Sequence, residues 1–125
     1  MKALRGGLVL PDGTSNPMPR RNLAWGAWRA PIPARLMPEV GTAQVGTYPE
    51  DKSPYGVHDL VGNVEEWTLT PFETGVHVVR GANWGQADAR NLLLFMAVEN
   101  PRPDGTQNFA LGVRCAARPP APATP

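Results

Sequence analysis

Glycine and proline interrupt this chain so often that long helices and long strands have little room to form. The 125 residues include 13 glycines and 15 prolines. Proline removes a backbone hydrogen-bond donor, and glycine loses more conformational entropy on ordering than any other residue. Hydrophobic residues still make up 42% of the sequence, which is enough for a core. We therefore expect one domain that is rich in turns and has few long regular elements.

Charge and cysteine content exclude several classes of function. Twelve basic and 11 acidic residues leave a net charge of +1 without a basic run, so there is no electrostatic footprint for nucleic acid. No stretch approaches the ~20 apolar residues that cross a bilayer, and the apolar start of the chain breaks at Pro11 without a cleavage site. We expect no membrane span, no signal peptide and, by default, a cytoplasmic chain. The single cysteine, Cys115, excludes an internal disulfide, and we expect it to be buried as a small hydrophobe.

Short apolar or β-branched runs mark the expected strands. The clearest is Val76–Arg80, which is β-branched and alternates weakly. Residues 92–97 are apolar throughout, and we expect a strand there because two prolines follow closely. Residues 110–116 are expected to form the last strand, and residues 8–10 and 45–48 two short ones.

Residues 55–70 look like the most ordered stretch. Their apolar side chains recur at helix-like spacing, at Val57, Leu60, Val61, Val64 and Trp67. Spacing alone favours an amphipathic helix capped by Asp59, with Glu65 and Glu66 in water.

The same stretch also resembles a family signature. It reads Asp59-Leu-Val-Gly-Asn-Val-Glu-Glu-Trp67 and is similar to the Gly-Asn-Val-Trp-Glu-Trp segment of the formylglycine-generating-enzyme (sulfatase-modifying-factor) family. Val79-Arg-Gly-Ala-Asn-Trp84 resembles the Arg-Gly-Gly-Ser-Trp box of that family, and Leu111-Gly-Val-Arg-Cys115 resembles its Leu-Gly-Phe-Arg-Cys strand. One departure stands inside the first motif, because Glu65 replaces a tryptophan that helps to line the family's active site.

The resemblance implies a calcium site on the first motif. Asp59 and Glu66 would supply carboxylate oxygens, and Gly62 and Val64 backbone carbonyls. Calcium takes six to eight hard oxygen ligands in a flexible cage, so these groups suit it. The family's second calcium site has a weak counterpart that starts at Asn22 and Leu23, but its later aspartate has no match here.

The resemblance also implies a ligand pocket, whose candidate residues are Asn83, Trp84, Gln86 and Asn91. Active members of the family bind copper through two cysteines and oxidise a substrate cysteine to formylglycine. Gln86 and Asn91 stand at the matching positions, and amide side chains are poor ligands for Cu(I), which prefers thiolates. We therefore expect no copper and no catalytic residues.

For the fold, the resemblance implies an α+β, C-type-lectin-like domain with short antiparallel strands. A partial sulfatase-modifying-factor domain is expected over residues 1–118 and a disordered, Pro/Ala-rich tail over residues 119–125. The family's N-terminal half has no counterpart, so we expect an exposed apolar face, and the missing half of the domain is a candidate partner.

Three functions stay open at this stage. The first is a non-catalytic, calcium-stabilised module that binds a protein or a small ligand through its loops. The second is an enzyme, either a formylglycine-generating oxidase or a fragment of an ergothioneine-type sulfoxide synthase. The third is a structural remnant without activity. The absent cysteine pair and the absent half-domain favour the first.

Overall fold

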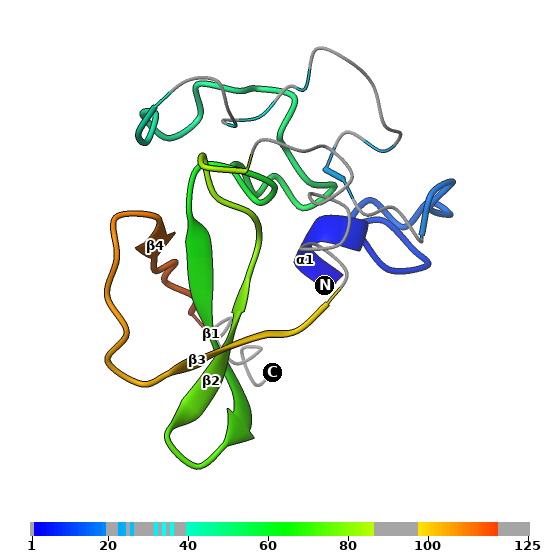
Figure 1. The fold of residues 1–125 in the computed structure, drawn as a ribbon. Coiled ribbons are helices and arrows are strands. Elements are labelled where there is room, and N and C mark those ends of the chain that lie inside the picture. The colour runs from blue at the N-terminus through cyan, green and yellow to red at the C-terminus, as the bar shows by residue number, and fades with distance from the viewer. Residues whose placement is uncertain are drawn as a thin grey trace.

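Regular structure is sparse in the computed structural model, as the density of glycine and proline predicts. The structure describes residues 2–19, 23, 24, 26, 32, 34, 36, 40–86 and 98–117. Within them, one short helix and four strands form, namely α1 (Lys2–Arg5), β1 (Glu65–Glu73), β2 (Val76–Arg80), β3 (Asn100–Pro103) and β4 (Leu111–Gly112) (Figure 1). No helix in this described part of the chain is long and apolar enough to cross a membrane.

The four strands form one curled, mixed sheet in the order β3-β2-β1-β4. The pairs β1–β2 and β2–β3 are antiparallel, and β1 pairs with β4 in parallel. Strand β2 confirms the strand expected at Val76–Arg80. A tight turn joins β1 to β2, and Gly75 adopts a φ of 73° there, which a side chain disfavours. A sheet with little helix is consistent with the α+β expectation.

The helix interpretation of residues 55–70 is wrong. Bends run to residue 64, and β1 begins at Glu65. Two residues other than glycine, Asp59 and Asn63, have positive φ values of 56° and 72°. A right-handed helix needs φ near −63°, so neither residue continues a helical turn. Of the five apolar side chains at helix-like spacing, only Val61 is fully buried, and the other four are half-buried along the bent loop and the start of β1.

Three of the other strand expectations are wrong in length or in kind. Of residues 110–116, only Leu111–Gly112 forms a strand. Residues 45–48 form a turn around Gly46, and residues 8–10 contribute only the isolated bridge between Val9 and Ser15. The strand expected at 92–97 and the tail expected at 119–125 lie outside the described residues.

The start of the chain holds the short helix α1. Helix α1 ends at Arg5, and Gly6 and Gly7 follow with φ values of 84° and 71°. Glycine commonly ends helices in this left-handed conformation.

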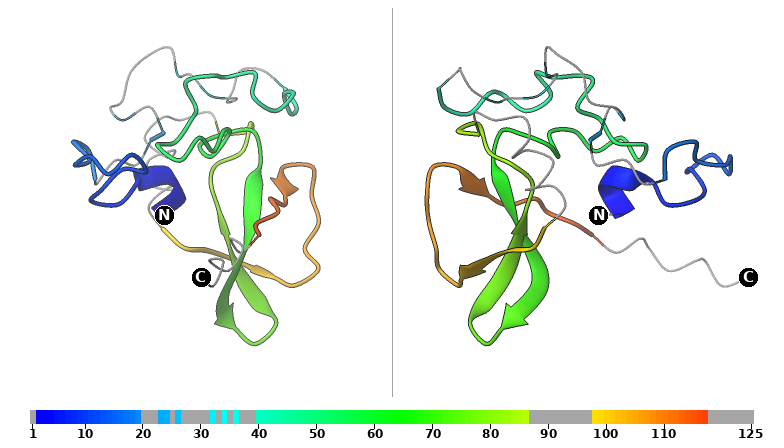
Figure 2. Two further views of the ribbon diagram at one scale, coloured as in Figure 1. Left: turned by 180° about the vertical axis from the view of Figure 1, so that it is seen from behind. Right: turned by 45° about the vertical axis from the view of Figure 1, so that its right-hand side comes forward.

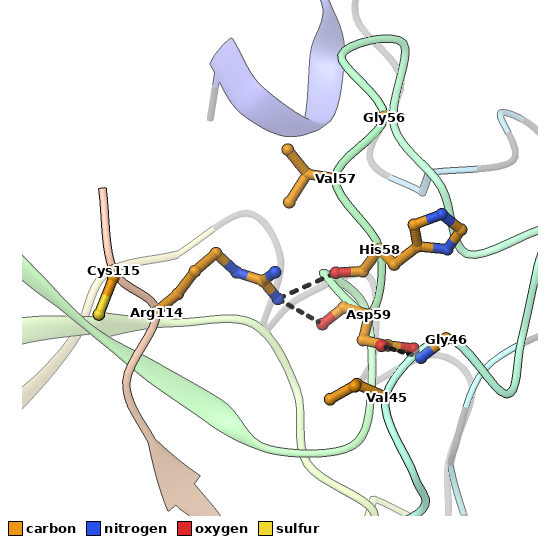
Figure 3. A pocket seen from close by; sticks show the side chains of 8 residues that line it. All are labelled: Val45, Gly46, Gly56, Val57, His58, Asp59, Arg114 and Cys115. Atoms are coloured by element: carbon orange, nitrogen blue, oxygen red, sulfur yellow. Dashed lines mark hydrogen bonds between the residues drawn. The ribbon is translucent and has the colours of Figure 1, made fainter. Parts of the chain in front are cut away.

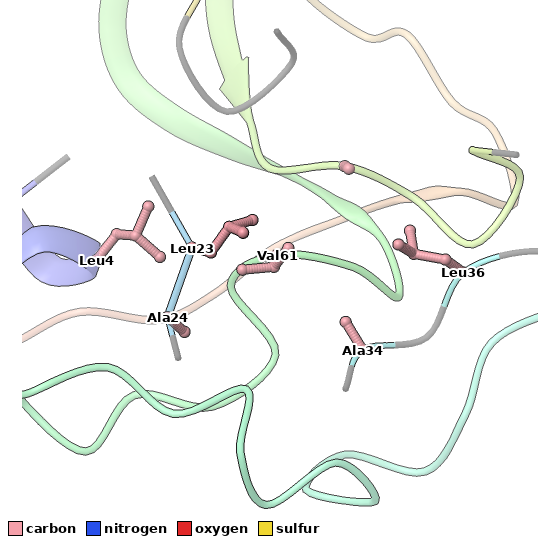
Figure 4. Close-up of a cluster of buried hydrophobic side chains, with 7 residues drawn as sticks. Leu4, Leu23, Ala24, Ala34, Leu36 and Val61 are labelled. Atoms are coloured by element: carbon pink, nitrogen blue, oxygen red, sulfur yellow. The ribbon is translucent and has the colours of Figure 1, made fainter. Parts of the chain in front are cut away.

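The core joins α1 to the bent loop, which is formed by residues 55–64 and precedes β1. Its members are small or aliphatic and almost fully buried, namely Leu4, Leu23, Ala24, Ala34, Leu36, Val61 and Ala82 (Figure 4). Val61 is fully buried, and its carbonyl accepts a hydrogen bond from the backbone of Ala82 at 3.2 Å. The loops of residues 40–64 lie at one end of the sheet, and the β1–β2 turn lies at the other (Figure 2). The candidate site residues sit at the loop end.

Candidate functional site

Arg114 holds the bent loop and the start of the sheet together. Its Nε donates to Oε2 of Glu66 at 3.0 Å, and its Nη2 donates to Oε1 of the same carboxylate at 2.5 Å. The same Nη2 donates to the backbone carbonyls of His58, at 2.9 Å, and Asp59, at 3.4 Å (Figure 3). The hydrogen bonds to Glu66 raise the pKa of Arg114 above its ordinary value. Four oxygens therefore converge on one guanidinium cation.

Two of the expected calcium ligands, Asp59 and Glu66, contact this guanidinium. Asp59 presents its carbonyl to Arg114, while its Oδ2 accepts the backbone N–H of Gly46 at 2.7 Å. Both carboxylate oxygens of Glu66 are bound to Arg114. Gly62 is buried and Val64 half-buried in the bend between them.

The donor chemistry of this segment fits calcium, because every candidate group is a hard oxygen. The described residues contain no group of three or more His, Cys, Asp or Glu side chains that could hold a metal ion. An ion here would therefore depend on backbone carbonyls, as calcium sites commonly do. The carboxylates of Asp59 and Glu66, which the ion would also bind, already accept hydrogen bonds from protein N–H groups.

Asp51 holds the bent loop through hydrogen bonds that both its side chain and its backbone accept. Its side chain is 1% exposed, and its Oδ2 accepts the backbone N–H of Val61 at 3.3 Å. Its backbone carbonyl accepts the N–H of Asp59 at 2.9 Å. The other carboxyl oxygen, Oδ1, is buried without a hydrogen-bond partner in the described structure. Burial raises the pKa of Asp51 to about 7, so a proton on Oδ1 suits this environment.

A shallow pocket of about 570 Å³ opens beside Arg114. The residues that line it come from three separate segments, namely Val45, Gly46, Gly56, Val57, His58, Asp59, Arg114 and Cys115 (Figure 3). Cys115 is exposed, so the expectation of a buried cysteine is wrong. It lies beyond the end of β4, where the chain no longer pairs with the sheet.

The residues expected to line a ligand pocket form a tight turn after β2. The backbone N–H of Gln86 donates to the carbonyl of Asn83 at 3.1 Å, and Oδ1 of Asn83 accepts from Gly85 at 2.9 Å. Trp84 packs against Phe109, with ring centroids 5.6 Å apart. The indole Nε1 of Trp84 is buried and has no partner in the described structure. Asn83, Trp84 and Gln86 are thus brought together, whereas Asn91 and Asn22 lie outside the described residues.

Glu65 is the centre of a polar network that the sequence did not reveal. Its side chain is 5% exposed. Oε1 accepts from Asn83 at 3.0 Å, while Oε2 accepts from Asn100 and Arg102, both at 3.4 Å. The network ties β1 to the turn after β2 and to β3. A buried carboxylate therefore stands at the position where the resemblance expects an aromatic ring. Arg102 lies 37 positions away, so no local pattern announced this pair.

A comparison with protein-family models identifies the family of this chain. The model of the sulfatase-modifying factor enzyme 1-like domain matches residues 2–119, which is nearly the whole chain. The chain belongs to this family. The match confirms the family that the sequence motifs indicated.

Two relatives of this sulfatase-modifying-factor domain bear on its chemistry. A protein of Bos taurus named inactive C-alpha-formylglycine-generating enzyme 2 is 33% identical over 135 residues, an alignment that covers 94% of this chain and 42% of that protein. The protein of the same name from Mus musculus is 32% identical over 128 residues, covering 91% of this chain and 39% of that protein. The chain thus spans less than half the length of the curated relatives it matches.

Proposed function

We propose that this chain is a non-catalytic sulfatase-modifying-factor module that binds a protein or small ligand through its loops. The observation that carries the proposal is the single cysteine. Cys115 lines the pocket beside Arg114, while Gln86 stands in the turn where the family resemblance places a copper ligand. Soft thiolates are what Cu(I) requires, and an amide cannot replace one. The names of the two relatives, which call them inactive, support the same reading.

Copper binding tests this proposal without an assumed ligand. The chain is mixed with Cu(I) in the presence of excess bicinchoninate, a coloured competing chelator. We expect the chelator to keep the copper, because one exposed thiol supplies a single soft ligand. Cys115→Ser serves as the control for that thiol. Retention of one copper per chain against the chelator, by the unaltered protein, contradicts a non-catalytic role.

Calcium is the second part of the proposal. The ion would be held by the carboxylates of Asp59 and Glu66 and by the backbone carbonyls of Gly62 and Val64. A bound calcium ion would link the bent loop to β1. The hard-oxygen donors of these residues support this. A second site at Asn22 and Leu23 stays a prediction. Leu23 is buried in the core at 1% exposure, so only its backbone carbonyl suits such a role.

The ligand is proposed to meet the turn at Asn83, Trp84 and Gln86. A buried indole N–H without a partner is a donor that a ligand acceptor would satisfy. Asn83 is held in place by Glu65, so its position is set before any ligand arrives. The neighbouring amide of Gln86 adds a neutral donor and acceptor. A polar, uncharged ligand suits this set.

The remainder of a sulfatase-modifying-factor domain is the proposed protein partner. The β1–β2 hairpin exposes 97% of Leu69 and 52% of Phe72. Val113, next to β4, is 76% exposed. Exposed apolar side chains on strands often mark a docking surface. The relatives contain more than twice the matched length, which supplies a polypeptide to cover these side chains.

A further inference from the structure

Two Asp-Gly pairs stand at exposed turns of this chain, at Asp12-Gly13 and at Asp104-Gly105. An aspartate that precedes glycine can react with its own main chain, because glycine has no side chain to keep its nitrogen from the carboxyl carbon. The surroundings of the two pairs differ, and only the second pair leaves the reacting nitrogen without a hydrogen bond inside the described structure.

Both reacting groups of the first pair are occupied. The N–H of Gly13 donates to the carbonyl of Leu10 at 3.0 Å. Oδ1 of Asp12 accepts from the N–H and from the hydroxyl of Thr14, at 3.0 and 2.7 Å. These hydrogen bonds lower the pKa of Asp12, so its carboxyl stays ionised. An ionised carboxylate is a poor electrophile, because its negative charge repels an attacking nitrogen.

The second pair lies in the turn after β3 and is open to reaction. The N–H of Gly105 donates to no group in the described part of the chain. Gly105 has a φ of 80°, and nothing lies within 4 Å of the place where a side chain would begin. The side chain of Asp104 is 53% exposed, and its Oδ1 lies 2.7 Å from Nδ1 of His77 on β2. An imidazolium at this distance can protonate a leaving oxygen.

We propose that Asp104-Gly105 is a site of spontaneous covalent modification, at which aspartate is converted to isoaspartate with His77 as the proton donor. The nitrogen of Gly105 attacks Cγ of Asp104, and the new N–Cγ bond closes a five-membered imide. One carboxylate oxygen leaves as water, with one proton from the N–H of Gly105 and one from protonated His77, which becomes neutral. Water then opens the ring. Cleavage between the nitrogen and the α-carbonyl carbon of Asp104 gives isoaspartate, and cleavage of the N–Cγ bond restores aspartate.

The modification would change the end of the sheet that carries the β1–β2 turn. The N–H of Asp104 donates to the carbonyl of Gly75 in that turn at 2.8 Å, while its carboxyl contacts His77. Isoaspartate lengthens the main chain by one carbon and makes the former α-carboxyl the side group, so the contact with His77 is rearranged. The reaction itself is independent of the proposed function.

The test ages the unaltered chain at physiological temperature in mildly acidic buffer. The chain is then digested with endoproteinase Asp-N, which cuts before aspartate but not before isoaspartate. Mass spectrometry of the peptides measures both pairs, and the imide appears as the loss of one water. We expect isoaspartate to accumulate at Asp104 and to form several-fold more slowly at Asp12. In strong denaturant the two pairs should react at similar rates, because only the fold distinguishes them.

Matched variants identify the reacting groups. Gly105→Ala places a side chain beside the attacking nitrogen and should strongly reduce isoaspartate at Asp104, while Gly13→Ala, the control, should leave it unchanged. His77→Gln keeps a hydrogen-bond donor but cannot supply the proton, so we expect the reaction at Asp104 to slow by about tenfold. Circular dichroism checks that each variant is folded, and the comparison within the unaltered chain holds where one is not.

Equal rates at the two pairs of the folded chain, or no isoaspartate at Asp104, contradict the modification site. An unchanged or higher rate at Asp104 in His77→Gln contradicts the role of His77 as the proton donor.

Discussion

The carboxyl of Asp51 makes the stability of this chain depend on pH. Burial raises its pKa from the ordinary value of 3.8 to about 7 in the folded state, so the folded chain holds the proton more tightly than the unfolded chain does. Asp59 adds to the rise, while the backbone N–H of Val61 and the charge of Arg114 oppose it. The contribution of Asp51 to stability is therefore greatest below pH 4 and is lost as the pH rises to about 7.

Asp51→Asn imitates the protonated carboxyl at every pH. Because the amide keeps an acceptor for Val61 and carries no charge, we expect it to raise the melting temperature at pH 8 by several degrees and to change it little at pH 4. Melting curves from pH 4 to pH 8 measure this. Glu73→Gln, at an exposed position on β1, is the control. The same difference between Asp51→Asn and the unaltered chain at both pH extremes contradicts the raised pKa.

Residue roles could be predicted only where a local motif carried them. Asp59 and Glu66 stand out through a continuous signature, and the structure places both beside one cation. Arg114 lies 48 positions from Glu66, so its role is visible only once the chain has folded. The prediction that Cys115 is buried was wrong for a related reason. Its expected burial required a strand through residue 116, and pairing stops at Gly112.

At the level of elements, pattern reasoning succeeded for β2 and failed for the segment before β1. Val76–Arg80 is β-branched, pairs on both sides and follows a glycine turn, so local preference and tertiary pairing agree. In residues 55–64 the apolar spacing is helical, but the chain turns through the left-handed residues Asp59 and Asn63. Hydrogen bonds from distant groups hold those turns, such as the bond from Ala43 to Oδ1 of Asn63 at 2.9 Å. Spacing alone does not encode such bonds.

The β1–β2 hairpin offers a test of the proposed partner surface. Leu69→Lys with Phe72→Lys should leave the melting temperature nearly unchanged, because both side chains are exposed in the isolated chain. We expect the double variant to lose binding to the part of the bovine relative that lies outside the matched region. Binding by the unaltered chain is measured with that polypeptide on a biosensor surface.

Leu8→Lys provides the control for this surface. Leu8 is 77% exposed. The segment that follows α1 lies away from the β1–β2 hairpin (Figure 1), so a change at Leu8 should not affect the interaction. Equal binding by the double variant and the unaltered chain, or no binding by either, contradicts the proposed surface.

The molecule as a whole combines a family scaffold with an altered interior. The family match spans residues 2–119. The core joins α1, the bent loop and Ala82, which follows Gly81 at the end of β2. Within that scaffold, Glu65 and its partners fill a position that the resemblance gives to an aromatic ring, and Gln86 stands where it gives a thiol. The scaffold was predictable from three short motifs. The polar network was not, because it joins β1, β3 and the turn after β2.

The proposed function is non-catalytic, so this chain should not oxidise a substrate cysteine. The most direct measurement is mass spectrometry of a sulfatase peptide incubated with the chain, copper and oxygen, with an active formylglycine-generating enzyme as the positive control. We predict that the peptide cysteine keeps its mass with this chain, because the protein has no pair of thiolates to hold copper. Copper-dependent conversion of that cysteine to formylglycine by the unaltered chain contradicts the account.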